Sequence, residues 1–434
     1  MTVEDLAGIL GPASRALELI ERGFSERMAV QIAVTDSRKR QDALELVLDT
    51  VSQKDSLTKA LDAVLGQRRF SQKERMFLTM VCHLILTSST AILERSVRAI
   101  REETPLGIAR EVEKLIGEIR GATKNGVALG ETDEEQVAIR THQQVWWAKY
   151  CFRLLGRSAA IDFLSSSDRP RFVHVNPLKN SGSWTLPEEK RPDLGHALIK
   201  ALPDCDVYRL GASPFVLSKY FAEGLFQLQD LASFLAVMVA DPRPHERVLE
   251  LCAAPGSKTS TIAQKMMNLG QIVSVDMSST RLRMWRHHID RMGVRIAEPV
   301  LADASNLGIN DGFDLVIVDP PCSGTGVFDR NPRMKWYVSP RSVEKYSTIQ
   351  QAFLDQAVSL VGGQGRIVYS TCSITTEENE GVISSFLANH AEFETRPTLS
   401  YLGSPGRGSL TNCRRFYPHS DHTAGYFIAK MQRT

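Results

Sequence analysis

The sequence predicts an α/β fold, with a mostly parallel sheet in the C-terminal half and helices in the N-terminal part. After Leu225, short strand-like apolar runs alternate with amphipathic helices. This pattern is typical of βα units with right-handed crossovers. Up to about residue 120, proline is almost absent and apolar residues follow a 3.6-residue period, which favours helices. Two cysteines, Cys322 and Cys372, each follow one of the strand-like runs.

The N-terminal region predicts a helical domain over residues 1–142. Leucine-rich spacing in Ala43–Val51 and Leu57–Leu65 fits the helical period. Ser71-x-x-Glu74 before a long apolar run is typical of a capping box, in which serine and glutamate each bind the other's backbone amide. A cluster of turn-forming and acidic residues, Gly121–Glu135, is the best candidate for a linker.

Residues 143–225 are predicted to form a small α/β subdomain. Trp146–Leu155 has a helical pattern, and Arg171–Asn176 alternates like a strand. A turn-rich segment, Pro177–Asp193, follows.

Residues 226–434 carry the regular alternation and form the third predicted domain. The expected strands are Arg247–Leu251, Ile272–Val275, Pro299–Leu301, Leu315–Val318, Arg366–Tyr369 and Tyr426–Met431. In an open parallel sheet, ligands bind beyond the carboxyl ends of the strands. We therefore expect the functional residues in the loops that follow these runs.

Composition narrows the class of protein. The chain has 434 residues, 43% apolar content and a formal net charge of +2, so no basic excess indicates nucleic-acid binding. Seven scattered cysteines without a Cys-x-x-Cys pair argue against a disulfide framework and a structural zinc site, and favour a reducing cytosol. The acidic N-terminus lacks the positive region of a secretory signal. No apolar stretch is long enough to cross a bilayer.

The turn after the first strand predicts a cofactor site. It has the sequence Leu251-Cys-Ala-Ala-Pro-Gly256-Ser-Lys258-Thr, in which small residues and Gly256 allow close approach of a ligand. Asp276 ends the next strand, twenty residues after Gly256, a spacing that suits hydrogen bonds to a ribose diol. Asp303, just past the third strand, is placed to bind the amino group of an adenine.

The spacing in this turn favours S-adenosylmethionine over ATP or NAD. A phosphate-binding loop requires Gly-x4-Gly-Lys, whereas a serine separates Gly256 from Lys258 and no glycine precedes them in register. A dinucleotide-binding Gly-x-Gly-x-x-Gly is also missing. The alternative, a tight turn without a ligand, does not account for Asp276 and Asp303.

Asp319-Pro-Pro-Cys322 and Cys372 predict covalent chemistry on a pyrimidine. The C5 carbon is a poor nucleophile until a thiolate adds to C6, and cysteine is the natural group for that step. Asp319 is then placed to act near N3. Asp-Pro-Pro also suits methylation of an exocyclic base amine, and each cysteine alone could be an inert buried thiol. Position alone does not rank the two thiols.

Three motifs closely resemble the Nop/Sun family of RNA cytosine-C5 methyltransferases. They are Leu249-Glu-Leu-Cys-Ala-Ala-Pro-Gly-Ser-Lys-Thr, Asp319-Pro-Pro-Cys-Ser-Gly-Thr-Gly-Val and Tyr369-Ser-Thr-Cys-Ser. The resemblance extends from about Gly224 to the C-terminus. Upstream, Ser71-Gln-Lys-Glu-Arg-Met-Phe-Leu is similar to the helical NusB-like domain of the bacterial Fmu-type 16S ribosomal RNA enzyme.

The resemblance implies a Rossmann-like class I methyltransferase domain with a seven-stranded, mostly parallel sheet, preceded by a small α/β subdomain and an all-α NusB-like domain. It implies that Cys372 is the nucleophile and that Cys322 assists release of the methylated RNA. The family usually has glycine at Ser257, and we expect cofactor binding to survive this change. The implied cofactor contacts are Cys252, Ala253, Ala254, Pro255, Gly256, Ser257, Lys258, Asp276, Asp303 and Asp319.

Three further features each have two interpretations or a structural role. Lys258 is expected to pair with the cofactor carboxylate or to contact RNA, with a solvated surface lysine as the alternative. Asp329–Trp336 carries basic side chains and a tryptophan, which suits a nucleic-acid backbone and a stacked base, or a charged loop with one packed tryptophan. Thr375-x-x-Glu378 is a second candidate capping box, so Glu377 and Glu378 are expected to start a helix.

The predicted function is methyl transfer from S-adenosylmethionine to C5 of a cytosine in RNA, with ribosomal RNA favoured and transfer RNA open. The alternatives are a base-amine RNA methyltransferase and a non-catalytic RNA-binding factor. We expect no metal and no membrane. The oligomeric state is left open, with a monomer as the favoured state.

Overall fold

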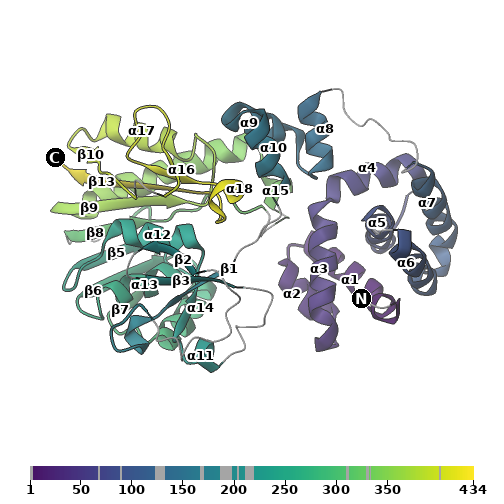
Figure 1. Cartoon of the computed structure of the whole chain (residues 1–434), viewed down its shortest axis with the longest axis horizontal. Helices are drawn as coiled ribbons and strands as arrows, with labels where there is room; N and C mark the ends of the chain where they lie inside the picture. Colours follow the sequence, from purple (N-terminus) through teal and green to yellow (C-terminus); the bar gives the residue numbers. More distant parts are fainter. Residues whose placement is uncertain are drawn as a thin grey trace. The chain divides into compact units, whose positions relative to one another are not determined.

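The structure is a computed structural model that describes residues 3–66, 69–87, 90–122, 132–166, 171–185, 198–202, 205–210, 219–308, 312–328, 332, 334–399 and 402–434. Its contacts divide the chain into two compact units (Figure 1). The first consists of Met1–Ser165 and Asn331–Tyr337, and the second of Ser166–Arg330 and Val338–Thr434. Within the described residues, no helix is both long and apolar enough to span a membrane.

The first unit is helical, as its periodicity predicts. Apolar side chains spaced at the helical period form one continuous core, from Ile9 to Ile116. Ser71 and Glu74 form the predicted capping box: the Ser71 amide donates to Glu74 Oε2 (2.8 Å), and the Glu74 amide donates to Ser71 Oγ (3.3 Å). The helices of this core are α1 (Val3–Glu21), α2 (Glu26–Ala33), η1 (Ser37–Lys39), α3 (Arg40–Ser52), α4 (Lys54–Leu65), α5 (Gln72–Thr87), α6 (Thr90–Glu103), η2 (Leu106–Ile108) and α7 (Ala109–Ala122).

Three more helices complete the main segment of this unit: α8 (Asp133–Arg140), α9 (Val145–Leu155) and α10 (Arg157–Ser165). The predicted helix from Trp146 corresponds to α9, which lies in the first unit although we placed it in the small α/β subdomain. Most of the expected linker, residues 123–131, lies outside the described residues. The division into three domains stays a prediction.

A small antiparallel sheet opens the second unit. Its strands are β1 (Arg171–Val175), β2 (Leu198–Leu202), β3 (Cys205–Leu210) and β4 (Phe226–Leu228), in the order β2-β3-β1-β4. The short helices η3 (Pro177–Lys179) and α11 (Lys219–Ala222) lie between its strands in the chain. The predicted strand from Arg171 is confirmed. Strand β4 follows residue 225, the boundary that the sequence suggested.

The large sheet contains the six predicted strands. They are β5 (Arg247–Leu251), β6 (Gln271–Asp276), β7 (Ala297–Leu301), β8 (Phe313–Val318), β9 (Val361–Thr371) and β13 (Tyr426–Arg433). Strands β7, β6, β5, β8 and β9 are parallel neighbours in that order, and β13 pairs antiparallel with β9. The described sheet has nine strands rather than seven, because short edge strands β10 (Phe393–Thr395), β11 (Ser404–Pro405) and β12 (Arg414–Phe416) join it.

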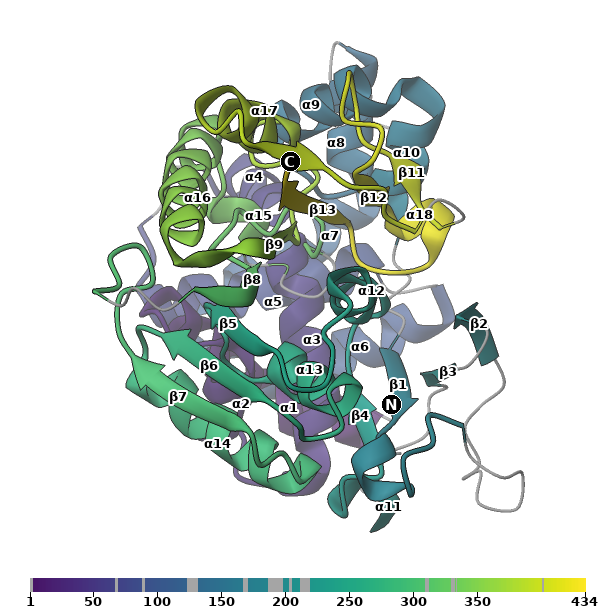
Figure 2. The ribbon, with the colours of Figure 1, turned by 90° about the vertical axis from the view of Figure 1, so that its left-hand side faces the viewer.

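Alternating apolar residues of the central strands supply both faces of this sheet. Val248 and Ile317 pack with helices α12 (Leu231–Ala240), α13 (Ser257–Lys265) and α14 (Ser279–Met292). Leu249 and Val316 pack with α16 (Pro340–Leu360) and α17 (Glu380–Asn389) on the other face. Figure 2 shows the two groups of helices on opposite sides of the strands. The remaining helices, α15 (Met334–Tyr337) and α18 (Pro418–Asp421), are single turns.

Candidate active site

The two predicted thiols meet at the carboxyl edge of the sheet. Cys322 lies in the loop after β8, and Cys372 directly follows β9, the parallel neighbour of β8. Their Sγ atoms are 3.2 Å apart, and the Gly326 amide donates to the Cys372 carbonyl (2.9 Å). The two loops that carry the thiols therefore face each other. The roles of the two thiols stay predictions.

The surroundings of Cys322 and Cys252 keep both thiols protonated. The hydrogen bond shared with Cys372, together with burial, raises the pKa of Cys322 well above its ordinary value. Cys322 therefore keeps its proton near neutral pH and can donate a hydrogen bond to the Cys372 sulfur. A third thiol at this edge, Cys252, has its pKa raised to about 12 by burial, so it too stays protonated.

Asp319, at the end of β8, forms an ion pair with Lys258 of α13. Lys258 Nζ lies 2.6 Å from Asp319 Oδ2, and the Lys258 side chain is 9% exposed. Asp319 Oδ1 accepts hydrogen bonds from Ser370 Oγ (3.0 Å) and the Tyr426 hydroxyl (3.3 Å). Burial alone would lower the pKa of Lys258, but the negative charge of Asp319 raises it above its ordinary value. The surface-lysine alternative for Lys258 is therefore wrong.

We predict that Lys258→Met destabilises the fold by about 2 kcal/mol, because it leaves the half-buried Asp319 carboxylate without its cation. The free energy of unfolding in urea measures this effect. Lys265→Met is the matched control on the same helix. Its ammonium lies 3.8 Å from Asp241 Oδ1 in a partly exposed pair. We expect the control to change stability by less than about 0.5 kcal/mol. Equal losses for both variants would contradict the prediction.

The loop after β5 has the backbone geometry of a ligand cradle. Cys252 and Gly256 have φ angles of 63° and 105°, and Gly256 directly precedes helix α13. A Cβ atom on Gly256 would lie 2.9 Å from the ring of Trp285, so only glycine fits here. Ser257 is the first residue of α13, where a serine adopts the helical backbone without strain. Ala253 and Ala254 are buried, and Pro255 is exposed.

We predict that Gly256→Ala weakens S-adenosylmethionine binding and destabilises the protein by about 1 to 3 kcal/mol, because a side chain is strained at this φ and crowds Trp285. Calorimetric titration and thermal unfolding measure the two effects. Gly363→Ala is the control, since no atom lies within 4 Å of its added Cβ and its φ is ordinary. An unchanged affinity in Gly256→Ala would show that the loop does not hold the cofactor.

The two predicted carboxylates lie at the ends of neighbouring strands at this same edge. Asp276 is 2% exposed and accepts hydrogen bonds from the amides of Ala254 (3.2 Å) and Ser278 (3.0 Å), so it ties the β5 loop to β6. Asp303 follows β7 and is exposed. The Ser305 amide lowers the pKa of Asp303, which therefore stays ionised near neutral pH. An acceptor for an adenosine group is thus available at this edge of the sheet.

Some residues of this region were not predicted from the sequence. Gln227 contacts the first turn of helix α13, where its Nε2 donates to the Ser257 carbonyl (2.6 Å). Arg281 bonds to the Ala254 carbonyl, and its guanidinium lies 3.4 Å from Asp276 Oδ2. Gln227 falls inside a segment that carries the family resemblance, and this is a weak sequence signal for a functional residue. No sequence signal marked Arg281.

The second capping-box prediction is wrong. Helix α17 begins at Glu380 with Asn379 as its N-cap, and the Glu378 side chain does not cap it. Glu378 is completely buried and accepts hydrogen bonds from the loops that carry both thiols. The Thr375-x-x-Glu378 pattern thus marked the correct residue but predicted the wrong contact.

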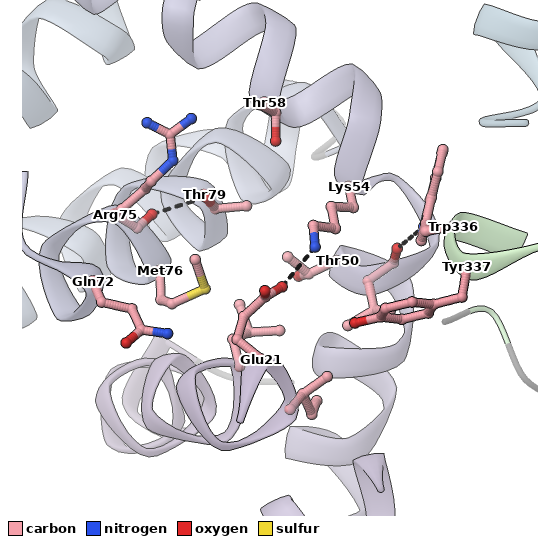
Figure 3. Close-up of a pocket in the computed structure, with 13 residues that line it drawn as sticks. Glu21, Thr50, Lys54, Thr58, Gln72, Arg75, Met76, Thr79, Trp336 and Tyr337 are labelled. Atoms are coloured by element: carbon pink, nitrogen blue, oxygen red, sulfur yellow. Dashed lines mark hydrogen bonds and ion pairs between the residues drawn. The ribbon is translucent and has the colours of Figure 1, made fainter. Parts of the chain in front are cut away.

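The segment predicted to bind RNA packs within the helical unit. The Trp336 indole donates to the Val51 carbonyl (2.7 Å), and Lys335, 4% exposed, donates to Ser52 Oγ (2.8 Å). Figure 3 shows Trp336 and Tyr337 at the rim of a pocket of about 400 Å³ in this unit. The packed-tryptophan alternative is therefore supported for Lys335 and Trp336. Arg330 and Arg333 lie outside the described residues.

The parallel sheet, the cradle after its first strand, and the acid and thiols at the ends of β8 and β9 define a methyltransferase of the Rossmann-like class. Residues 237–432 match the family model described as 16S rRNA methyltransferase RsmB/F. Over this portion, the chain is similar to the RsmB/F methyltransferase family. The predicted resemblance to Nop/Sun and Fmu-type enzymes is confirmed.

Individual relatives agree with the family. The chain is 29% identical over 413 residues to a Bacillus subtilis protein named probable ribosomal RNA small subunit methyltransferase B, covering 90% of this chain and 89% of that one. It is 34% identical to a mouse 28S rRNA (cytosine-C(5))-methyltransferase, covering 64% of this chain but 37% of the mouse protein. It is 35% identical to a Pyrococcus horikoshii tRNA (cytosine(72)-C(5))-methyltransferase, covering 50% and 54%. The chain thus spans about half or less of the last two.

The fold also has close structural counterparts. The crystal structure of PH0851 superposes with a TM-score of 0.81 at 24% identity, covering all of this chain and 99% of the other. At that identity the likeness concerns the fold. A methyltransferase homologue from Pyrococcus horikoshii superposes with a TM-score of 0.62 at 28% identity, covering 70% of this chain and all of the other.

Proposed function

We propose that this protein is an S-adenosylmethionine-dependent RNA (cytosine-C5)-methyltransferase that forms a covalent bond between Cys372 and C6 of its target. The observation that carries the proposal is the 3.2 Å separation of the two sulfurs, beside the ion pair of Asp319 and the cradle after β5. One thiol alone would suit an inert buried residue. Two thiols at this edge, of which Cys322 stays protonated, match a reaction that makes and later breaks a carbon–sulfur bond.

The cofactor is S-adenosylmethionine, in agreement with the methyltransferase family match. When bound, it supplies the methyl group that C5 receives. Gly256 lets the loop pack closely against Trp285, and the first amides of α13 can bind an anionic group. The exposed Asp303 suits hydrogen bonds from the adenosine moiety. Asp276 contributes mainly by holding the loop in place through the Ala254 amide.

Different residues of the chain act at different steps of the reaction on the base. Addition of the Cys372 thiolate to C6 forms the carbon–sulfur bond and moves the ring electrons toward N3 and C5. The Lys258–Asp319 pair then supplies a proton or hydrogen bond at N3, which changes the role that the sequence suggested for Asp319 alone. After methylation, a base removes the C5 proton, the electrons of the broken C–H bond re-form the C5–C6 double bond, and Cys372 leaves as the thiolate. The Cys322 thiol stabilises this leaving sulfur by a hydrogen bond.

We further propose that the substrate is ribosomal RNA, which the family description and the Bacillus and mouse relatives favour. The Pyrococcus relative keeps transfer RNA as the second candidate. The helical unit, which we propose to be a NusB-like domain, would bind the RNA. Since both faces of the C5–C6 bond must be reached, the target cytosine has to leave its stack.

Methylation of total RNA from a strain that lacks the gene tests the proposal. The purified protein and labelled S-adenosylmethionine are added, and the digested nucleosides are identified by mass spectrometry. We expect 5-methylcytidine, and bisulfite sequencing then locates it. Methylated adenine or guanine would indicate the base-amine alternative. No transfer to any RNA would indicate a non-catalytic RNA-binding factor.

A further inference from the structure

A single buried carboxylate is bonded by both loops that carry the thiols. Glu378 Oε2 accepts a hydrogen bond from the Ser323 amide (2.8 Å), and Oε1 accepts bonds from the Ser323 and Ser373 hydroxyls, the latter at 2.8 Å. Ser323 directly follows Cys322, and Ser373 directly follows Cys372. The carboxylate is thus joined to the neighbour of each sulfur.

Two more donors complete the surroundings of this group. Thr375 Oγ1 donates to Oε1 (2.9 Å), and Gln350 Nε2 donates to Oε2 (2.9 Å). Glu378 is 0% exposed, and no lysine, arginine or histidine pairs with it among the described residues. Because a buried carboxylate is costly without hydrogen bonds, its five donors are bound strongly and in fixed directions.

The next two residues, Asn379 and Glu380, also anchor the Cys372 loop. Asn379 accepts a hydrogen bond from Thr371 Oγ1 (2.7 Å) and donates to the Ser373 carbonyl (2.9 Å). Glu380 forms a buried ion pair with Arg415, whose Nη1 donates to the Ile374 carbonyl (2.8 Å). The backbone on both sides of Cys372 is therefore anchored independently of Glu378.

Direct bonds also join the two loops. Besides the sulfur contact, the Ser373 hydroxyl lies 3.2 Å from Ser323 Oγ and 2.9 Å from Thr325 Oγ1, the Ile374 amide donates to Thr325 Oγ1 (3.0 Å), and the Gly326 amide donates to the Cys372 carbonyl. Glu378 is the acceptor for the amide of Ser323, the residue next to Cys322. Losing the carboxylate would leave a buried amide without an acceptor, and the loop would have to move to find one.

We propose that Glu378 is a positioning residue, which sets the separation of the Cys322 and Cys372 sulfurs by binding the residue next to each. This inference rests on the proposed function for its catalytic meaning, but the geometric statement stands apart from it. Glu378 contacts neither sulfur by any hydrogen bond of the described residues, so it acts through the loops. A carboxylate that instead removed a proton in the reaction would be a catalytic base.

Glutamine distinguishes the two roles. In Glu378→Gln, the amide oxygen can still accept from the Ser323 amide and Gln350, while the amide nitrogen donates to hydroxyls that can reverse their bonds. A positioning role therefore survives this change, whereas a base would be lost. Glu378→Ala removes every bond. Glu377→Ala is the matched control, because Glu377 is exposed and adjacent.

Oxidative cross-linking of the two thiols measures the geometry without RNA or cofactor. Full-length protein is treated with diamide, and the Cys322–Cys372 disulfide is quantified by peptide mass spectrometry. We expect Glu378→Ala to form it roughly tenfold more slowly than the unmodified protein, and Glu378→Gln within about threefold. Glu377→Ala should not differ. Cross-linking of Glu378→Ala at the unmodified rate would overturn the proposal.

Ser373→Ala keeps the test valid if Glu378→Ala fails to fold. It removes one donor to Glu378 together with the bonds from the Ser373 hydroxyl to Ser323 and Thr325, and we expect a smaller slowing in a protein that folds. A rate equal to that of the unmodified protein would again count against the proposal.

Methylation assays test the catalytic consequence of the positioning role. We expect kcat to fall in Glu378→Ala with KM unchanged, and Glu378→Gln to retain most of the kcat of the unmodified protein. Loss of kcat in Glu378→Gln with normal cross-linking would make Glu378 a catalytic base. If no RNA is methylated at all, the proposed function fails while the cross-linking result still stands.

Discussion

Cys372→Ala is expected to abolish methylation, lowering kcat by at least about a thousandfold, because C5 of cytosine gains its nucleophilic character only after sulfur adds to C6. The same variant should form no covalent complex with RNA that contains 5-fluorocytosine. Fluorine at C5 cannot leave as a proton does, so the unmodified protein stays attached. Denaturing gel electrophoresis detects that complex.

Cys413→Ala is the matched control for this variant. Cys413 is completely buried, and burial raises its pKa to about 12, so it cannot act as a thiolate. The control should lose stability but keep both methylation and trapping. Trapping that persists in Cys372→Ala, with the adduct mapped to Cys322, would exchange the roles of the two thiols.

The parallel strands could be predicted because buried strands have a simple local signature. Arg247–Leu251 is a short apolar run between turn signals, and β5 has those bounds. The edge strands β10 and β11 have three and two residues. They exist because β13 and β12 offer backbone partners. Nothing in so short a stretch of sequence marks such pairing, and the sheet was therefore predicted to be smaller than it is.

In the candidate site too, some contacts could be predicted from the sequence and others could not. The approach of Cys322 and Cys372 follows from topology, since neighbouring parallel strands end at one edge. The contacts of Lys258 and Glu378 depend on groups that are 61 and 55 residues away in the chain, the Asp319 carboxylate and the Ser323 amide. A one-dimensional pattern such as Thr375-x-x-Glu378 fits both a helix cap and a long-range hydrogen-bond centre. Only the packed structure distinguishes them.

The basic and aromatic segment around Trp336 was ambiguous for a physical reason. Lysine and tryptophan both have a large apolar surface and a polar end, so the same residues suit an exposed nucleic-acid surface or a buried contact. Here Lys335 and Trp336 use their polar ends on Ser52 and Val51 of α3. An RNA surface on the protein therefore has to be sought from residues other than these two.

Cys322→Ala is expected to have a different phenotype: addition to C6 and methylation proceed, but the RNA stays attached. The Cys322 thiol lies 3.2 Å from Cys372 and keeps its proton, so it can stabilise the sulfur that must leave the ring. Without it, release slows while bond formation, which needs only the thiolate and the proton at N3, continues. The expected result is a covalent protein–RNA complex with ordinary RNA, seen on a denaturing gel.

The double variant tests whether the stalled adduct is bonded to Cys372. If the complex in Cys322→Ala is the stalled adduct of Cys372, then Cys322→Ala combined with Cys372→Ala must form none. The RNA recovered from the stalled complex should already carry the methyl group, because release follows transfer. An unmethylated base in that complex would place Cys322 before methyl transfer instead. The 3.2 Å contact would then serve to activate Cys372 for attack rather than to assist its departure.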